Sequence, residues 1–298
     1  LSSNPCALVM DGLGELSDSA AEGLAGHCGI LQLQGIAELS ENAARSLSRQ
    51  KGNLYLDGMA RLSDQVAEFL ASHRGNPSGV GEQGYLGLSG LSELSAKAAE
   101  HLSTHGDISL SGLTTLEEVV ACSFAKHQGE LYLDGLSKIS DTVAQQLGLH
   151  QGNLYLNGLT EISATAAEAL SEHRYMLWLQ SLNSLEPEVA EGLFRHKGVL
   201  VLDGLTALDK EIAAILARHP GDRQLDGVRT LSDVAAQALS SHQGVLNLNG
   251  LEELSDNAAR SLANHNGELG LNGLVSLSDT AGKYLAGAAG KLWLPEAL

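Results

Sequence analysis

The chain repeats itself every 23 residues, and this period constrains its fold more than any single residue does. The clearest copies read Leu-Tyr-Leu-Asp/Asn-Gly and begin at Leu54, Leu131 and Leu154. The leading apolar residue of the pattern recurs at Leu8, Leu31, Leu54, Leu86, Ile108, Leu131, Leu154, Leu177, Leu200, Leu246, Leu269 and Leu292. Arg223 replaces it in one copy; the step from Leu54 to Leu86 carries an insertion, and the next step is shorter than the rest. A fixed period of roughly 20–50 residues is typical of a solenoid, in which each unit buries its apolar face against its neighbours.

Each unit predicts a strand, a turn and a short helix. The alternation Leu-x-Leu has the period of a half-buried strand, with the leucines inward and the middle residue outward. The glycine that follows, such as Gly58, indicates a backbone conformation or a close approach that a side chain would obstruct. Next comes an Ala-Ala-x-x-Leu pattern, as in Ala43, Ala44 and Leu47, whose residues share one helix face. A second glycine, two residues after a recurring histidine, is expected to stop the helix.

Serine side chains are the expected N-caps of these helices. They are Ser17, Ser40, Ser63, Ser95, Ser140, Ser163, Ser232, Ser255 and Ser278.

The units resemble leucine-rich repeats, and the cysteine-containing subtype most of all. The segment from Leu131 to Asp141 is similar to that subtype's L-x-L-x-x-C-x-x-I-T-D, although Leu136 stands where the family has Cys or Asn. The resemblance runs from about Leu8 to Leu294. It implies a right-handed α/β solenoid of about 12 repeats, with a parallel β-sheet on the concave side and short α-helices on the convex side. It also implies a protein-binding module that uses the concave strand face.

Repeat continuity predicts a single solenoid over residues 1–298. Residues 1–29 are expected to form an N-terminal repeat or cap, and residues 269–298 a degenerate C-terminal repeat or cap. Residues 76–84 are rich in turn formers and are expected to form an inserted loop, either a part of the binding face or a neutral excursion.

Charge and motif content exclude several functions. The net charge is −18, with 36 acidic and 18 basic residues, which disfavours nucleic acid and anionic membranes as partners. No apolar run is long enough for a membrane span, so no membrane insertion is expected. The sequence has no G-x-S-x-G, P-loop, paired-cysteine or His-Glu-x-x-His motif, so we expect no enzyme and no cofactor.

Ten histidines occupy one position of the repeat, and they suggest a metal site, a pH switch or a structural ladder. The ladder is favoured, because each histidine lies where a helix ends and carbonyls need donors, and no carboxylate pattern accompanies them. Acid should then destabilise the fold through repulsion between protonated neighbours. The ten are His27, His73, His105, His127, His150, His173, His196, His219, His242 and His265.

The three cysteines are too few for a disulfide framework. Cys6 and Cys28 frame the first repeat, and stacking would bring them together, either as a disulfide or as two free thiols. A disulfide would indicate an oxidising, extracellular or cell-surface compartment, and free thiols the cytoplasm. Cys122 is expected in the core.

The outward residues of the strands supply the candidate binding surface. Tyr132, Tyr155 and Trp178 fall on three consecutive strands, beside a polar and acidic row. Such a composition is typical of an interface hot spot, with Asp134 and Asp203 selecting a basic protein partner. The alternatives are a carbohydrate surface, aromatic side chains that only cover the sheet, and a structural spacer. The predicted binding residues are Tyr55, Tyr132, Asp134, Tyr155, Asn157, Trp178, Gln180 and Asp203.

Overall fold

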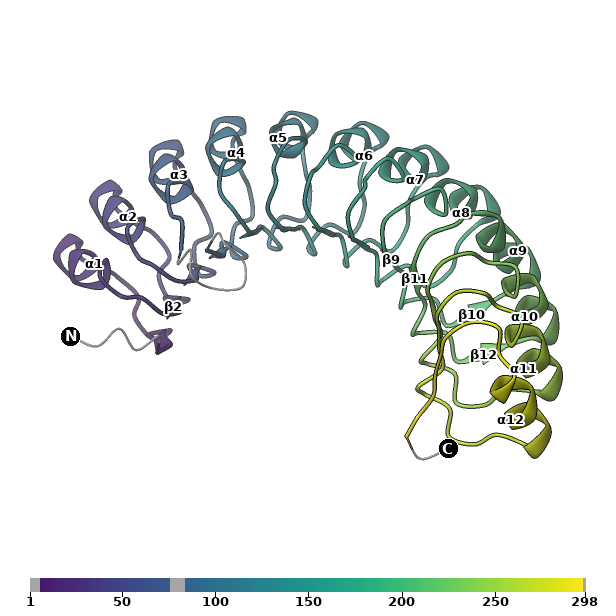
Figure 1. The fold of residues 1–298 in the computed structure, drawn as a ribbon. Helices are drawn as coiled ribbons and strands as arrows, with labels where there is room; N and C mark the ends of the chain where they lie inside the picture. The colour runs from purple at the N-terminus through teal and green to yellow at the C-terminus, as the bar shows by residue number, and fades with distance from the viewer. Residues whose placement is uncertain (1–5, 76–83, 297–298) are drawn as a thin grey trace. The chain divides into compact units, whose positions relative to one another are not determined.

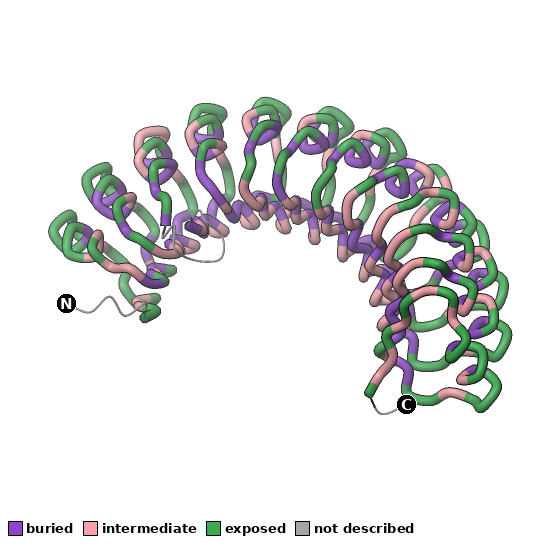
Figure 2. Tube along the Cα trace, in the orientation of Figure 1, coloured by how far each residue is buried: buried purple, intermediate pink, exposed green. Residues whose placement is uncertain are grey.

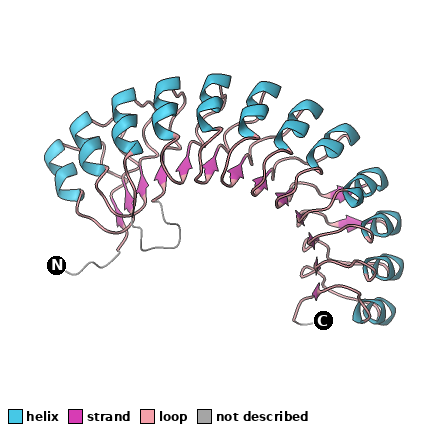
Figure 3. Cartoon of the chain, turned by 45° about the horizontal axis from the view of Figure 1, so that its top comes forward, coloured by secondary structure: helices cyan, strands magenta, loops and turns pink. Residues whose placement is uncertain are grey.

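The computed structural model describes residues 6–75 and 84–296 (Figure 1). The chain divides into two compact units, Leu1–Leu156 and Asn157–Leu298. Within each unit, short strands follow one side and helices follow the other (Figure 3). The continuity of both units as one solenoid over 1–298, with caps at 1–29 and 269–298, remains a prediction. Residues 76–83 of the expected inserted loop lie outside the described residues.

The first unit repeats strand and helix in alternation. Its described strands are β1 (Leu8–Val9), β2 (Leu31–Gln32), β3 (Leu54–Tyr55), β4 (Leu86–Gly87), β5 (Ile108–Ser109), β6 (Leu131–Tyr132) and β7 (Leu154–Tyr155). Its described helices are α1 (Asp18–Leu24), α2 (Glu41–Leu47), α3 (Asp64–Ala71), α4 (Ala96–Leu102), α5 (Glu118–Phe124) and α6 (Asp141–Leu147).

The second unit continues the alternation and adds one short pair of strands. Its main described strands are β8 (Leu177–Trp178), β9 (Leu200–Val201), β11 (Arg223–Gln224), β13 (Leu246–Asn247), β14 (Leu269–Gly270) and β15 (Leu292–Trp293). Its described helices are α7 (Ala164–Leu170), α8 (Pro187–Leu193), α9 (Lys210–Arg218), α10 (Asp233–Leu239), α11 (Asp256–Leu262) and α12 (Asp279–Ala286). The additional strands β10 (Ala207–Leu208) and β12 (Thr230–Leu231) pair with each other.

The strands are parallel and pair in the register of the repeat. Leu8 lies opposite Leu31, for example, and Leu131 lies opposite Leu154. Leu54 still lies opposite Leu86 despite the insertion between them. The residues on either side of this insertion lie next to each other, because the Gly84 amide donates to the Arg74 carbonyl at 3.0 Å.

The core lies between the strands and the helices, as the pattern predicts (Figure 2). The strand leucines Leu131 and Leu133 are fully buried, whereas Tyr132 between them is partly exposed. Helices with the Ala-Ala-x-x-Leu pattern bury it, for example Ala166, Ala167 and Leu170 of α7, and α5 buries Val120, Ala121 and Phe124 at the same positions. The expected α/β solenoid of leucine-rich-repeat type is confirmed.

The serine N-caps are confirmed at all nine expected positions. In α7 the Ala166 amide donates to Ser163 Oγ at 2.9 Å. Some caps also join neighbouring coils, since Ser95 Oγ donates to Asp64 of the preceding helix at 2.5 Å. The serine hydroxyl thus accepts a bond from a backbone amide that would otherwise be unpaired at the helix start, and in such caps it also links two repeats.

Both glycine positions serve close packing between coils. A Cβ at Gly58 would lie 2.0 Å from the Gln34 carbonyl oxygen, and one at Gly152 would lie 2.0 Å from the Gly129 carbonyl oxygen. The expectation that the second glycine stops the helix is wrong, because α6 ends at Leu147 with a right-handed C-cap, well before Gly152. The first glycine needs room rather than a left-handed conformation, since it has no positive φ at any described copy.

Gly135→Ala is expected to destabilise the protein by about 1–3 kcal/mol, because its methyl group would collide with the backbone of the preceding coil. The built Cβ lies 2.3 Å from the Ser111 carbonyl oxygen and 2.7 Å from that of Leu113. Gly12 is the matched control: it holds the same repeat position, and a Cβ there meets nothing within 4 Å. Urea unfolding of both variants checks this; equal midpoints would contradict the packing role.

All three cysteines are free thiols in the structure. Cys122 is exposed rather than in the core, because α5 buries Val120, Ala121 and Phe124, and Cys122 falls just outside this stripe. Cys6 and Cys28 are free thiols in this structure. A disulfide between Cys6 and Cys28 stays a prediction.

Every described helix is too short or too polar to span a bilayer.

Candidate functional site

The histidines of the first unit form a buried file along the ends of the helices. His73 is fully buried, and its ring stacks on that of His105 with 5.5 Å between centroids. His73 Nε2 lies 3.0 Å from Gln50 Oε1, and His73 Nδ1 lies 3.2 Å from His105 Nε2. Gln50 stands where other repeats have histidine, and its Nε2 donates to the Gly29 carbonyl at 2.5 Å. The file is thus a chain of neutral donors and acceptors, with each Nε2–H directed to the preceding coil.

His127 and His150 repeat this arrangement. His127 Nε2 lies 2.8 Å from the Gly106 carbonyl oxygen, and His127 Nδ1 lies 3.0 Å from His150 Nε2. The Gly152 amide donates to His150 Nδ1 at 3.3 Å, which fixes the Nε2–H tautomer of that ring. The structural ladder is therefore confirmed for His73, His105, His127 and His150.

Burial keeps these imidazoles neutral. It lowers the pKa of His73 and of His242 to about 4 and that of His105 and of His196 to about 3. Charged neighbours add a smaller effect, such as Arg223 beside His196 and His242. Among residues 6–75 and 84–296, no group of three or more His, Cys, Asp or Glu side chains could hold a metal ion.

Arg223 interrupts the leucines of the second unit and is fully buried. Its guanidinium donates to the carbonyls of Phe194 and His196, each at 2.9 Å, and to that of Gly198 at 3.4 Å. Burial lowers the pKa of Arg223 to about 10, so it remains charged at neutral pH.

In regular coils, two other donors bond the carbonyls that are equivalent to those of His196 and Gly198. The residue after the histidine donates its amide to the preceding histidine carbonyl, as Gln151 does to His127 at 3.0 Å. The imidazole bonds a glycine carbonyl of the preceding coil, as His242 does with Gly221 at 2.9 Å.

Pro220 removes both groups from its coil. It has no amide hydrogen, and it restricts the residue before it to an extended conformation. His219 accordingly has φ −109° and ψ 113°, and its Nε2 lies 3.1 Å from Glu191 instead of in the file. Arg223 therefore supplies the two donors that Pro220 and His219 do not.

Four tyrosines of the first unit lie side by side on the strand face, and we call Tyr55, Tyr85, Tyr132 and Tyr155 the tyrosine cluster. The ring centroids are 5.0 Å apart for Tyr55 and Tyr85, 5.9 Å for Tyr85 and Tyr132, and 4.0 Å for Tyr132 and Tyr155. The last pair is stacked with an interplanar angle of 11°. All four side chains are partly exposed.

Sequence reasoning missed Tyr85, because it precedes the strand and does not lie between the paired leucines. The outward positions of β4 and β5 hold Gly87 and Ser109, which both are buried. A Cβ at Gly87 would lie 3.0 Å from the Tyr55 ring. Tyr85 thus lies between Tyr55 and Tyr132, where β4 and β5 have only small outward residues. Those small residues were the sequence signal that could have indicated space for Tyr85.

The tyrosine hydroxyls lie in acidic surroundings. Tyr132 donates to Glu130 Oε2 at 2.5 Å, and Asn153 Nδ2 donates to Glu130 Oε1 at 3.0 Å. Burial, followed by hydrogen bonding with Glu130, raises the pKa of Tyr132. Burial also raises the pKa of Tyr85 and of Tyr155. The phenols of Tyr85, Tyr132 and Tyr155 consequently act as neutral hydrogen-bonding groups at physiological pH.

The acidic row beside the strands has a structural role as well. Its side-chain oxygens accept the amide of the equivalent residue in the next coil. Asp57 accepts from Ser89 at 2.8 Å, Asp203 from Asp226 at 3.0 Å, and Asp226 from Asn249 at 3.0 Å. These bonds fix one oxygen of each of the three carboxylates in place.

The predicted binding residues divide between the two units. Tyr55, Tyr132, Asp134 and Tyr155 belong to the first unit, where the tyrosines are in contact. The others, Asn157, Trp178, Gln180 and Asp203, belong to the second unit. There Gln180 Nε2 donates to Asp203 Oδ2 at 3.1 Å.

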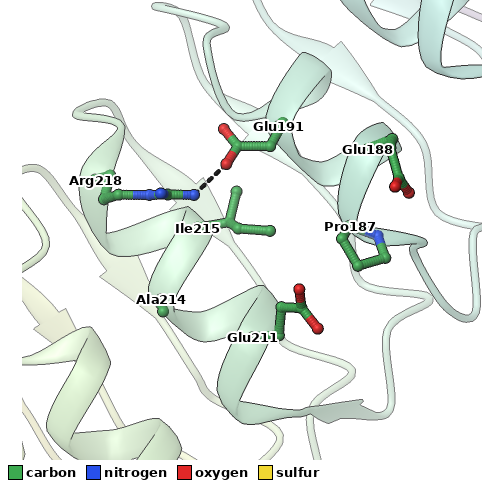
Figure 4. Close-up of a pocket in the computed structure, with 7 residues that line it drawn as sticks. All are labelled: Pro187, Glu188, Glu191, Glu211, Ala214, Ile215 and Arg218. Carbon is green, nitrogen blue, oxygen red and sulfur yellow. Dashed lines mark hydrogen bonds and ion pairs between the residues drawn. The ribbon is translucent and has the colours of Figure 1, made fainter.

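A separate groove of about 460 Å³ lies between α8 and α9 on the helix side of the second unit (Figure 4). Its walls carry Glu188, Glu191 and Glu211, and Arg218 is paired with Glu191. It has none of the aromatic groups of the strand face.

The repeats and their packing define a leucine-rich-repeat type of solenoid. No family model and no curated protein matches the sequence. Among solved structures, the chain is similar to an internalin from Listeria monocytogenes, at 14% identity over 93% of this chain and 76% of that one, with a TM-score of 0.46. It is also similar to a structure of the Rad7 and Elc1 complex in yeast, at 13% identity over 92% and 78%, with a TM-score of 0.46. A leucine-rich-repeat protein of Leptospira interrogans matches at 15% identity over 96% and 94%, with a TM-score of 0.30.

Proposed function

We propose that the protein is a non-enzymatic protein-binding module whose anchor is the tyrosine cluster, and that its partner presents a basic segment. The contiguous, partly exposed rings of Tyr55, Tyr85, Tyr132 and Tyr155 support this proposal most directly. Tyrosine offers a large contact area, a hydrogen-bonding tip and little rotational entropy to lose, and it is enriched at interface hot spots.

Charge supports a basic partner. The seven strand segments of the first unit, 7–11, 30–34, 53–57, 85–89, 107–111, 130–134 and 153–156, contain no Lys or Arg. They contain five carboxylates, Asp11, Asp57, Asp107, Glu130 and Asp134. These five carboxylates without a basic residue make a local excess of negative charge, and repulsion from Glu130 adds to burial in raising the pKa of Asp107. Cations of a partner would relieve this excess and pack on the tyrosine faces.

The double variant Tyr85→Ala/Tyr132→Ala is expected to weaken binding at least about 10-fold, because hot-spot aromatic residues contribute more than 1 kcal/mol each. The probe is a peptide selected from a random display library on the wild-type protein, and its affinity is measured by calorimetry. Tyr284→Ala is the control, since Tyr284 is an exposed tyrosine of α12 outside the cluster.

Unchanged affinity in the double variant, with circular dichroism confirming its fold, would contradict the proposal. Binding of glycans that depends on the same tyrosines would instead support a carbohydrate surface. A protein that yields no selectable ligand on this face would act as a spacer.

A further inference from the structure

The acidic row next to the tyrosine cluster contains a gap between two carboxylates. In four consecutive coils it reads Asp57, Ser89, Ser111 and Asp134. The serines are partly exposed, and Ser109 links them, with Oγ–Oγ distances of 2.8 Å to Ser89 and 3.2 Å to Ser111. Small hydroxyl side chains therefore separate two larger acidic ones along a single line.

Bonds between coils position the Asp57 carboxylate and the Asp134 backbone at the two ends of the gap. Asp57 Oδ1 accepts the Ser89 amide at 2.8 Å, and the Asp134 amide donates to Ser111 Oγ at 3.3 Å. Both acids act electrostatically on Tyr85, which lies alongside the gap. A cation that reaches either end would meet a carboxylate beside an aromatic ring, and the carboxylate of Asp57 is preorganised by its backbone bond.

We infer that this line binds an extended basic segment with two cationic side chains four residues apart, one at Asp57 and the other at Asp134. The inference rests on the proposed function and specifies its partner. Asp57 and Asp134 are separated by three strand spacings, or roughly 14 Å at about 4.8 Å each. Four residues of extended chain span about 13 Å, and residues i and i+4 point to the same face.

The rest of the segment fits the same surface. Its backbone would cross Ser89 and Ser111, whose hydroxyls can donate to and accept from peptide groups. The aliphatic stems of Arg or Lys would lie against Tyr85 and Tyr132. A spacing of two residues spans only about 7 Å, and a spacing of three places the second cation on the opposite face.

The test uses three synthetic peptides of equal composition, with two arginines separated by one, two or three Gly/Ser residues, titrated by calorimetry at low salt. The peptide with three intervening residues is expected to bind about five-fold more tightly than the others. Asp57→Asn and Asp134→Asn should each remove this preference, because each deletes a charge while retaining an acceptor oxygen. Asp226→Asn is the matched control, since Asp226 makes the same bond to the next coil at 3.0 Å but lies in the second unit.

Each result has a distinct meaning. Equal affinity for all three spacings, with a loss in Tyr85→Ala/Tyr132→Ala, would overturn the spacing inference and leave the proposed function standing. Equal weakening by Asp226→Asn and Asp57→Asn would also overturn the inference. Failure of all three peptides, together with tyrosine-independent binding of the display-selected peptide, would overturn both.

Discussion

Lowering the pH from 7 to 5.5 is expected to reduce the free energy of unfolding by roughly 5 kcal/mol. Histidines in the unfolded chain have a pKa of about 6.5 and take up protons over this range. His73, His105, His196 and His242 have folded pKa values of about 4, 3, 3 and 4 and do not. Because the unfolded state binds more protons, stability is fully present above pH 6.5 and is lost as pH falls towards the folded values. Each of the four contributes about 1.3 kcal/mol between pH 7 and 5.5.

The measurement is urea unfolding at several pH values between 7 and 5.5. His73→Gln should make the pH dependence of the free energy of unfolding shallower. Glutamine should fit at this position, because Gln50 already occupies an equivalent place in the file. Hydrogen bonding lowers the pKa of Asp18 and of Asp233, so these two exposed carboxylates titrate below the pH range of the experiment. A midpoint that stays constant over the range would refute the role of burial. Burial of single rings, rather than the expected repulsion between protonated neighbours, is the main cause.

Arg223→Leu is expected to destabilise the protein by roughly 3 kcal/mol, although it restores the consensus residue. It leaves the carbonyls of His196 and Phe194 without the donors that now lie 2.9 Å away, and a buried unsatisfied carbonyl costs about 1–3 kcal/mol. Pro220→Gln should recover most of this loss in the double variant. Glutamine restores the missing amide and frees His219 to turn inward.

A double-mutant cycle measured by urea unfolding separates this compensation from simple loss of packing. The coupling energy between Pro220→Gln and Arg223→Leu is expected to be about 2 kcal/mol in favour of the double variant. Additive effects of the two substitutions would show that Arg223 does not replace the proline's missing donor.

Much of the fold follows from the sequence, because a period of 23 residues leaves one way to bury most of the recurring leucines. The strand register, the serine N-caps and the inward Ala-Ala-x-x-Leu face were all predictable from single repeats. The misplacement of Cys122 shows the limit of such patterns, since the boundary of the buried stripe depends on how α5 is rotated. The glycines show another limit: their role depends on the coil beneath them, which a single repeat does not contain.

The candidate site was predictable only in part. The position of Tyr55, Tyr132 and Tyr155 between paired leucines predicts that they face outward, and the structure places Tyr132 and Tyr155 in contact. Tyr85 joins them because Gly87 and Ser109 leave space that a local pattern does not reveal.

The sequence by itself determined the repeating unit, its inward and outward positions and the acidic character of the chain, because these depend on neighbours along the chain. Tertiary structure alone decided which groups meet across coils: the neutral histidine file, the tyrosine cluster and the bonds from Arg223 to the carbonyls of Phe194 and His196. These contacts join residues about 20 or more positions apart, and their energies depend on burial and distance, which exist only once the coils are stacked.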